Sequence, residues 1–264
     1  MHPFSLEDKV ALVTGGGTGI GFGIASAYAR AGAVVVFNAR SEEKVEKALA
    51  EYRTAGIAAH GYVCDVTDES AVLDMVERIS RELGGVDILV NNAGIVERTP
   101  MLEMETADYK RIMDINLNAP FIVSKAVLPG MIKKRKGKII NICSMLSELG
   151  RETMAGYTAS KGGLKMLTKN IACEFAKYNI QCNGLGSGYI ETPLTAPLRQ
   201  RQPDGSRHPF DAFILARTPA ERWGTVGDIE GPAVFLASSA SDFVNGQILY
   251  VDGGILAYIG RQQA

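Results

Sequence analysis

Short apolar runs alternate with helical patterns along most of this 264-residue chain, and that alternation constrains the fold more than any other feature. Continuous runs of Val, Ile and Leu are typical of strands buried on both faces, and the intervening helices connect parallel strands. The expected strands lie at residues 10–16, 33–38, 58–66, 87–94, 137–144, 180–188 and 246–254. The expected helices lie at 20–31, 42–55, 69–83, 106–134, 157–178 and 226–238. The pattern predicts an α/β fold, a doubly wound parallel sheet with helices on both faces.

One segment breaks this rhythm. Residues 193–217 contain four prolines and many polar side chains, so we expect a long loop or lid that carries a short helix. No linker and no internal repeat interrupts the rest, which predicts a single domain over 1–264. Its cofactor half is expected at about 1–150, and its catalytic and substrate half at about 137–264.

Composition excludes several other classes of protein. The net charge is −1, so no nucleic-acid partner is expected, and the basic run at 133–138 is interpreted as a solvated helix end stopped by Gly137. Four cysteines without CxxC spacing and three histidines predict neither a disulfide framework nor a metal site. The chain shows no signal-peptide pattern and no apolar run of membrane-spanning length, so we expect a soluble, cytoplasmic protein without a membrane partner.

A glycine-rich segment, TGGGTGIG at 14–21, follows the first strand and opens the first helix. A helix N-terminus offers free N–H groups and a positive dipole to an anion, and glycine allows the backbone to approach a pyrophosphate closely. Gly15, Gly19 and Gly21 have the spacing G-x-x-x-G-x-G, which is not the G-x-G-x-x-G fingerprint. A tight strand–helix turn without a ligand is the alternative, and it would not need five glycines within seven positions. The segment therefore predicts dinucleotide binding in a Rossmann-type fold.

The end of the second strand bears on the choice of cofactor. An acidic residue there would bind the ribose 2′-hydroxyl of NAD, whereas a basic one would accept the 2′-phosphate of NADP. This chain has FNARS, with Asn38 at the expected acidic position and Arg40 two residues later. The absence of a carboxylate and the presence of a guanidinium favour NADP, with NAD as the alternative.

The stretch YTASK at 157–161 places a tyrosine and a lysine four residues apart. On a helix these positions share a face. A lysine ammonium beside a phenol is expected to lower the pKa of Tyr157 toward the range of a general base. Alone the spacing is weak evidence, because one such pair arises often by chance.

Several motifs appear together, in this order, on the alternating pattern. They are TGGGTGIG at 14–21, CDV at 64–66, NNAG at 91–94, Asn116 in DINLNAP, Ser144 in NICS, YTASK at 157–161 and VDGG at 251–254. In this combination the chain resembles the short-chain dehydrogenase/reductase family over nearly its whole length. The resemblance implies that Tyr157 is the acid/base, that Lys161 tunes it and binds the nicotinamide ribose, and that Ser144 holds the substrate oxygen. It further implies that Asn116 holds a water of a proton relay. Ser147 is the alternative to Ser144, and a structural hydrogen-bonding role is the alternative for Asn116.

The same resemblance implies a set of cofactor-binding residues along the carboxyl ends of the strands. They are Gly15, Thr18, Gly19, Ile20, Asn38, Arg40, Ser41, Asp65, Val66, Asn92, Ala93, Gly94, Tyr157, Lys161, Gly188, Ile190 and Thr192, with Asn91 beside them. One departure is visible, because Ser187 stands where the family usually has a proline before the glycine. The family also implies a homotetramer in which the helix at 157–178 packs between subunits.

The expected substrate region is polar. Arg98 follows NNAG, Ser147, Glu148 and Arg151 follow Ser144, and the 193–217 segment carries further charges. Such a lining predicts a small hydroxylated anion rather than a steroid or an acyl chain. Segments 147–153, 167–184 and 195–211 are similar to those of gluconate 5-dehydrogenases, which implies D-gluconate and 5-dehydro-D-gluconate as substrates. On that basis Arg98 is expected to bind the substrate carboxylate, with Ser144 and Tyr157 at the reacting carbon.

Three alternative functions remain at this stage. A 3-oxoacyl-carrier-protein reductase or another sugar or polyol dehydrogenase of the same family would share the core motifs. A non-catalytic protein that senses NADP(H) is the third alternative. Such proteins commonly lose catalytic residues, whereas Asn116, Ser144, Tyr157 and Lys161 are all present here.

Overall fold

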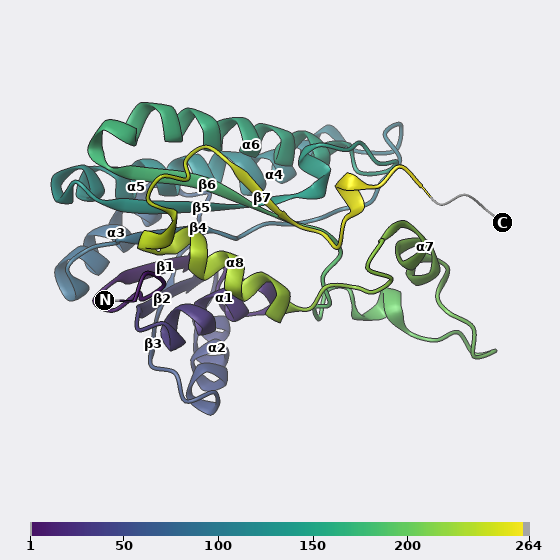
Figure 1. Ribbon diagram of the computed structural model, residues 1–264, viewed down its shortest axis with the longest axis horizontal. Helices are drawn as coiled ribbons and strands as arrows, with labels where there is room; N and C mark the ends of the chain where they lie inside the picture. Colours follow the sequence, from purple (N-terminus) through teal and green to yellow (C-terminus); the bar gives the residue numbers. More distant parts are fainter. Residues whose placement is uncertain (1, 261–264) are drawn as a thin grey trace.

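The computed structural model describes residues 2–260, in which seven parallel strands form one sheet in the order β3-β2-β1-β4-β5-β6-β7 (Figure 1). The strands are β1 (Val10–Thr14), β2 (Val34–Ala39), β3 (Ala59–Val63), β4 (Ile88–Asn91), β5 (Gly137–Ser144), β6 (Ile180–Ser187) and β7 (Ile248–Val251). The predicted parallel sheet is confirmed. Strand order reverses between β1 and β4, and ligands of open α/β sheets bind where the strands end at such a point.

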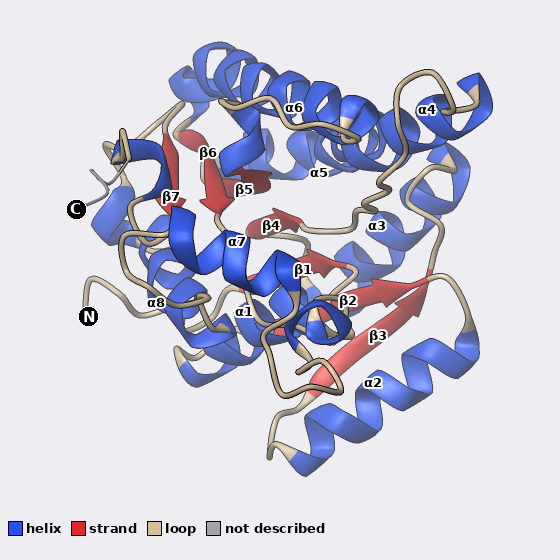
Figure 2. Ribbon diagram, turned by 90° about the vertical axis from the view of Figure 1, so that its right-hand side faces the viewer, coloured by secondary structure: helices blue, strands red, loops and turns tan. Residues whose placement is uncertain are grey.

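Helices cover both faces of the sheet, as Figures 1 and 2 show. They are α1 (Gly19–Arg30), α2 (Glu42–Thr54), α3 (Glu69–Leu83), α4 (Thr106–Met113), α5 (Ala119–Lys134), α6 (Ala155–Phe175), α7 (Pro209–Arg217) and α8 (Val226–Ala237). One core cluster joins the sheet to α1, α2 and α8, and a second joins it to α3, α5 and α6. Two apolar layers therefore bury the strands, which explains their continuous apolar runs.

Helix α3 illustrates how local sequence sets these elements. The Asp68 side chain accepts hydrogen bonds from the amides of Ser70 and Ala71 and so caps the N-terminus. Val72 and Met75 recur at helical spacing and are buried against the sheet. Gly84 ends the helix in the left-handed conformation (φ 84°). The predicted boundaries, 69–83, are those of the structure.

The long helix predicted over 106–134 is interrupted by a π-helical turn, Asp114–Asn118. Pro120 lacks an amide hydrogen, so it cannot donate to the carbonyl of Asn116 four residues earlier. The α-helical pattern therefore cannot continue through this point, and the chain adopts the wider turn. Pro129, expected to disturb the last turns, lies inside α5, which continues to Lys134.

By length and composition, the run Thr106–Lys134 is apolar enough to span a membrane. In this fold it lies in the helical layer instead. Val123, Val127 and Met131 are buried in the core cluster that α5 shares with α3 and the sheet. We therefore interpret it as a core helix.

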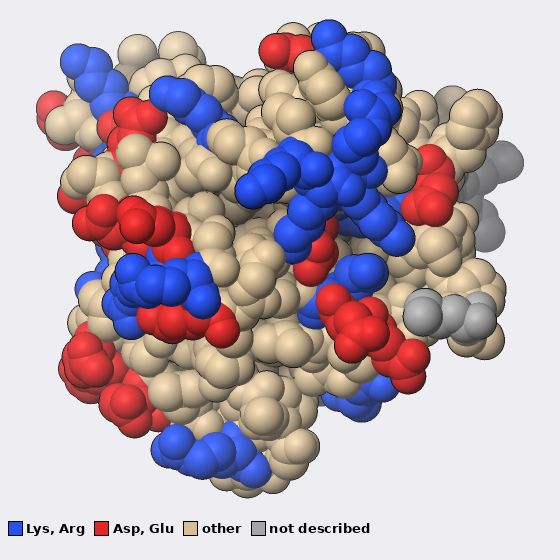
Figure 3. All heavy atoms as spheres, turned by 90° about the vertical axis from the view of Figure 1, so that its left-hand side faces the viewer, with Lys and Arg blue, Asp and Glu red and all other residues tan. Residues whose placement is uncertain are grey.

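Helix α5 ends earlier than the position of Gly137 suggested. Arg135 adopts the left-handed conformation (φ 51°) and forms the cap, whereas Gly137 begins β5 and leaves space for Met131. Residues 133–136 of the basic run form a solvated helix end, as predicted, and Lys134 pairs with Asp87 at 2.8 Å. Lys138 differs from the prediction, because it is buried in β5 and pairs with Asp242 at 2.7 Å. Figure 3 shows basic and acidic side chains together on this side of the molecule.

The segment that breaks the strand–helix rhythm leaves the sheet after β6 and returns before α8. It contains a 3₁₀ turn (Ala196–Arg199) and α7, which Figure 2 shows in front of the strand ends. Its neck is closed by backbone bonds, from the amide of Glu191 to Gly224 O (2.8 Å) and from the amide of Gly224 to Tyr189 O (2.9 Å). We call residues 191–224 the lid segment.

Candidate active site

The glycine loop (residues 14–21) adopts backbone conformations that require glycine. Gly15 and Gly19 have φ of 61° and 57°, a region that other residues rarely occupy. A Cβ on Gly15 would lie 3.2 Å from Ala93 Cα, so the loop also approaches the segment after β4 closely. The result is a bare backbone surface at the reversal point of the sheet.

The N-terminus of α1 suits an anion better than those of the next two helices. Thr18 makes no side-chain cap bond, and the first turn of α1 has no acidic residue. Ser41 caps α2, whose first turn contains Glu42 and Glu43. The free amides at the start of α1, where the glycine loop ends, and the positive end of the helix dipole are therefore available to an anion without a competing carboxylate.

Asn38 is buried and its side chain points inward. Its Oδ1 accepts from the amide of Gly15 (3.2 Å), and its Nδ2 donates to Cys64 O (2.9 Å). The residue therefore positions the glycine loop, and its role as a direct cofactor contact stays a prediction. Arg40 is exposed and forms no hydrogen bond or ion pair with other residues of the described chain. Its guanidinium is thus available to a phosphate.

A small cavity lies between the ends of β1 and β4. Four of its lining residues lie at or after strand ends, and three lie in the first turns of α5. They are Thr14, Val66, Asn91 and Ala93, and Ala119, Pro120 and Val123. Asn91 Oδ1 is buried there without a hydrogen-bond partner in the described residues. The feature that fits a dinucleotide is the bare glycine loop with the acid-free N-terminus of α1 beside it.

Asn92 connects the segment after β4 to the end of β1 through hydrogen bonds. Its side-chain nitrogen donates to Thr14 O (2.9 Å), and the Thr14 hydroxyl accepts from the amides of Asn92 and Ala93. Sequence reasoning missed Thr14, and it also missed Tyr52, whose hydroxyl donates to Gly16 O at 2.6 Å. These contacts fix the position of the glycine loop. They join residues distant in sequence, so no local sequence pattern predicts them.

The predicted catalytic residues come together at the end of β5 and the start of α6. The hydroxyl of Ser144 lies close enough to the Tyr157 phenol to act on its pKa, which it lowers. Lys161 is buried, lies 5.7 Å from the Tyr157 ring centroid through its Nζ, and donates to Ile142 O at 2.6 Å. Ser147 instead accepts from the amide of Ser144 at 3.3 Å. Ser144, rather than Ser147, therefore faces the phenol.

The pKa of Tyr157 differs from the expectation. Burial raises it above its ordinary value, although the Ser144 hydroxyl and the Arg98 charge act in the opposite direction. In the chain by itself desolvation dominates this pKa, and the tuning role of Lys161 stays a prediction. Burial also lowers the pKa of Lys161 to about 8.

Asn116 is fully buried in the π-helical turn. Its Oδ1 accepts from the amide of Ile95 (2.8 Å), and its Nδ2 donates to Ile95 O (2.9 Å) and to Ser160 (3.2 Å). The side chain therefore connects the segment after β4 to α6. Its role in a water relay stays a prediction.

Several polar residues expected around the substrate are held by partners within the protein. Glu148 binds Lys165 and the Tyr250 hydroxyl at 2.6 Å. In the lid segment, Arg207 pairs with Asp211 at 2.8 Å and Arg199 with Glu191 at 3.3 Å. Of the polar residues in this region, Arg98 and Tyr189 act on the pKa of Tyr157. Tyr189 is a further residue that sequence reasoning missed.

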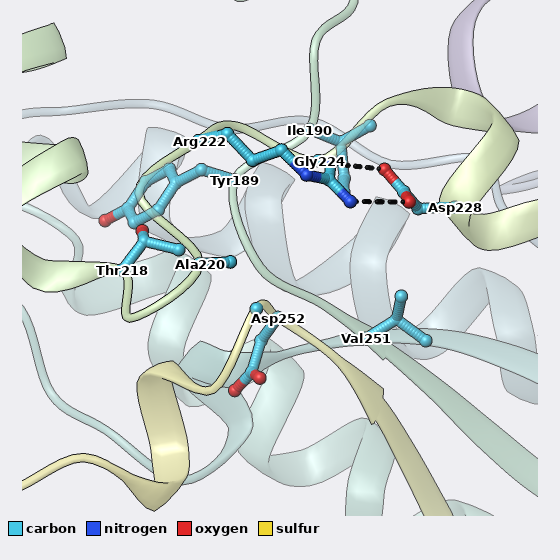
Figure 4. Close-up of a pocket in the computed structure, with 10 residues that line it drawn as sticks. Tyr189, Ile190, Thr218, Ala220, Arg222, Gly224, Asp228, Val251 and Asp252 are labelled. Atoms are coloured by element: carbon cyan, nitrogen blue, oxygen red, sulfur yellow. Dashed lines mark hydrogen bonds and ion pairs between the residues drawn. The ribbon is translucent and has the colours of Figure 1, made fainter.

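A cavity of about 80 Å³ lies at the base of the lid segment. Figure 4 shows Tyr189, Thr218 and Asp252 among the residues that line it. Arg222 forms a bidentate pair with Asp228 at its edge. Nearby, a Cβ on Gly188 would lie 2.7 Å from Asp252 Cα, so glycine is required where the chain leaves β6. Ile190 is buried beside this point, and Thr192 lies 3.8 Å from the Cβ position of Gly19. The lid segment thus begins against the glycine loop.

A doubly wound sheet with a bare glycine loop and a Ser–Tyr–Lys group at its carboxyl edge defines a nucleotide-dependent oxidoreductase. The family model for short-chain dehydrogenases matches residues 9–203. The chain belongs to this family and is an enzyme.

Known relatives cover the chain almost completely. A 2-dehydro-3-deoxy-D-gluconate 5-dehydrogenase from Formosa agariphila is 54% identical, covering 98% of this chain and 96% of its own. The crystal structure of a 2-keto-3-deoxy-D-gluconate dehydrogenase from Streptococcus agalactiae is 68% identical, with a TM-score of 0.86, and covers 98% and 97%. A gluconate 5-dehydrogenase from Burkholderia cenocepacia J2315, in complex with NADP and tartrate, is 45% identical, with a TM-score of 0.90, and covers 97% and 98%.

Proposed function

We propose that this enzyme transfers a hydride between NADP and a six-carbon sugar acid, interconverting D-gluconate and 5-dehydro-D-gluconate. The observation that carries the proposal is the position of the Tyr157 phenol, which lies close to the Ser144 hydroxyl and within the field of the Arg98 guanidinium. A proton-transfer group beside an unpaired cation suits an alcohol that carries a carboxylate. The relative that binds NADP and tartrate supports the same chemistry.

NADP, when bound, supplies or accepts the hydride. The glycine loop and the N-terminus of α1 hold its pyrophosphate, and Arg40 binds its 2′-phosphate. The remaining cofactor contacts are those expected from the sequence, with Asn38 and Asn92 shaping the loop through their own hydrogen bonds.

Tyr157 takes the proton of the alcohol during oxidation and returns it during reduction. Ser144 donates to the substrate oxygen and so places it beside the phenol. Lys161 binds the nicotinamide ribose, and Asn116 holds a water that carries protons behind Lys161. The raised pKa of Tyr157 keeps the phenol protonated in the chain by itself, which suits proton donation to a ketone.

Arg98 binds the substrate carboxylate. Its side chain is exposed, and its guanidinium lies 5.5 Å from the ring centroid of Phe210 in the lid segment. Within the described residues no carboxylate pairs with it, so its donors are available to a ligand.

A second substrate has specific support. The relatives at 54% and 68% identity act on 2-dehydro-3-deoxy-D-gluconate, a six-carbon acid that differs from gluconate at C2 and C3. Oxidation at C5 and recognition of a carboxylate are common to both substrates, so the site residues have the same roles in either case.

The quaternary state and the location are further proposals. We propose a cytoplasmic location and a homotetrameric assembly. The assembly is supported by exposed apolar side chains that subunit contacts would cover, namely Tyr109, Phe121 and Met166 on α4, α5 and α6. Light scattering after size exclusion tests the assembly, and a monomeric mass at micromolar concentration would contradict it.

Absorbance of NADPH tests the activity. We expect NADPH to be formed with D-gluconate or 2-dehydro-3-deoxy-D-gluconate and consumed with 5-dehydro-D-gluconate, and much slower consumption with acetoacetyl thioester. Faster turnover of the thioester would overturn the sugar-acid proposal and favour a 3-oxoacyl reductase. Parallel reactions with NAD and NADH test the assignment of NADP.

A further inference from the structure

Two guanidinium groups lie against one aromatic ring at the mouth of the site. The Cζ atoms of Arg98 and Arg151 are 5.5 Å and 4.7 Å from the ring centroid of Phe210. Arg98 follows β4, Arg151 follows β5, and Phe210 belongs to α7 of the lid segment. Three segments distant in sequence therefore bring two cations to one aromatic ring.

Arg151 is the more firmly held of the two. Its Nη1 donates to the hydroxyl of Tyr189 at 2.9 Å. Its Cζ also lies 5.9 Å from the Tyr189 ring and 6.0 Å from the Phe213 ring. Three rings and one hydrogen bond thus fix a side chain that is otherwise rich in rotamers, which lowers the entropy lost when it binds a ligand.

Neither cation has a carboxylate partner in the part of the chain that the structure describes, whereas Arg199, Arg207 and Arg222 each have one. A guanidinium has five N–H donors, and only one of those of Arg151 is used by Tyr189. Both cations therefore have spare donors, and a positive charge without a carboxylate partner in the described residues, with which to bind an anion.

The pair also lies at a suitable place. The Arg98 charge acts on the phenols of Tyr157 and Tyr189, and the Arg151 charge acts on Tyr189. Tyr189 accepts the hydrogen bond of Arg151 and packs, like Tyr157, against the apolar cluster of Met145, Leu146 and Met154. An anion held by both arginines would belong to a molecule short enough to place its reacting carbon at Tyr157.

We propose that Arg151 is a specificity-determining residue that binds the substrate carboxylate together with Arg98, in a position set by Tyr189 and Phe210. This inference rests on the proposed function and adds a second residue to the recognition of the acid. Because Phe210 lies on the lid segment and contacts both arginines, the carboxylate and the lid segment share one contact surface.

The test compares a charged substrate with its neutral counterpart. L-Sorbose has a hydroxymethyl group in place of the carboxylate of 5-dehydro-D-gluconate. We expect Arg151→Gln to lower kcat/KM for the acid about 10- to 100-fold, mainly through KM, since hydrogen bonds to charged groups are worth that much. The value for L-sorbose is expected to change less than about threefold, because the fold and proton transfer remain intact.

Two further variants complete the comparison. Arg201→Gln is the matched control, because this lid arginine donates to Gly205 O and does not contact the rings. Arg151→Lys keeps the charge but not the planar fork, so it is expected to restore only part of the activity. An equal loss on acid and ketose, or no loss on the acid, would overturn the inference.

Binding separates this inference from the proposed function. Calorimetric titration of the NADP-bound protein with D-gluconate needs no turnover. Arg151→Gln is expected to raise the dissociation constant about tenfold or more. A wild-type protein that binds the acid but never turns it over would overturn the proposed function alone. Unchanged binding in Arg151→Gln would overturn the inference alone.

Discussion

The ammonium nitrogen of Lys161 lies 2.6 Å from the carbonyl oxygen of Ile142 and donates a hydrogen bond to it. The contact places a charged group between α6 and β5, inside the core. Burial lowers the pKa of Lys161 from 10.5 to about 8. The charged form is therefore disfavoured in the folded protein relative to the unfolded chain.

Lys161→Met is expected to change how the stability of the cofactor-free protein depends on pH. Below pH 8 both states of the wild type carry the proton, so the whole penalty for burying the charge is present. Between about pH 8 and 10.5 the folded state loses its proton first, and the penalty disappears. The free energy of unfolding of wild type relative to the variant should therefore rise by about 3 kcal/mol across this range.

Urea unfolding of both proteins at pH 7, 9 and 10.5 measures this difference. Comparing the two proteins cancels the titration of all groups that they share. A difference that stays constant from pH 7 to pH 10.5 would show that the Lys161 ammonium is not desolvated.

Tyr157→Phe removes only the phenol oxygen, which lies close to the Ser144 hydroxyl. We expect kcat to fall by about 10² to 10⁴, the usual contribution of a positioned acid/base. NADPH binding, measured by fluorescence titration, should change little because the ring remains in place. Activity within a few-fold of wild type would exclude Tyr157 as the proton-transfer group.

Arg40→Gln tests the choice of cofactor. Loss of the exposed guanidinium at the end of β2 should raise KM for NADPH about 10- to 100-fold and leave KM for NADH nearly unchanged, because only NADPH carries the 2′-phosphate. Arg53→Gln, at an exposed position in the last turn of α2, is the control for a general loss of positive charge. Equal effects on both cofactors would contradict the assignment.

Gly19→Ala tests the glycine loop. At φ 57° an alanine is strained by about 1–2 kcal/mol, and its Cβ would enter the surface that faces the cofactor. We expect a lower melting temperature and weaker NADPH binding. Gly130→Ala on α5 is the matched control, since nothing lies within 4 Å of its Cβ, and it should stabilise the protein by up to about 1 kcal/mol. If NADPH binds equally well to both variants, the loop does not hold the pyrophosphate.

Much of the fold followed from local features of the sequence. The alternation of apolar runs and helical patterns predicted the sheet, because strand and helix periodicities are set by neighbouring residues. The bounds of α3 and β5 were predicted correctly, since a capping aspartate and a terminal glycine mark the first, and a continuous apolar run marks the second. The π-helical turn was not predicted, although Pro120 was visible.

The candidate site was predictable as a set of residues but not as a set of contacts. Tyr157 and Lys161 share a helix face because of their spacing, and they are brought to Ser144 by the packing of α6 on β5. Asn38 was placed correctly at the end of β2, yet its inward side chain depends on Gly15 and Cys64 from two other strand ends. Such contacts join residues that no local pattern relates.

The sequence by itself determined the strand and helix order and the glycine-rich turn after β1, and it predicted Tyr157 as the proton-transfer group, because periodicity, backbone sterics and residue chemistry are local properties. Only the tertiary structure decided that desolvation raises the pKa of Tyr157, that Ser144 rather than Ser147 lies close to it, and that Arg151 and Arg98 contact the same ring. Each of these depends on how deeply a group is buried and on which distant side chains surround it. Burial and proximity are properties of the folded chain, and they arise when separate segments pack together.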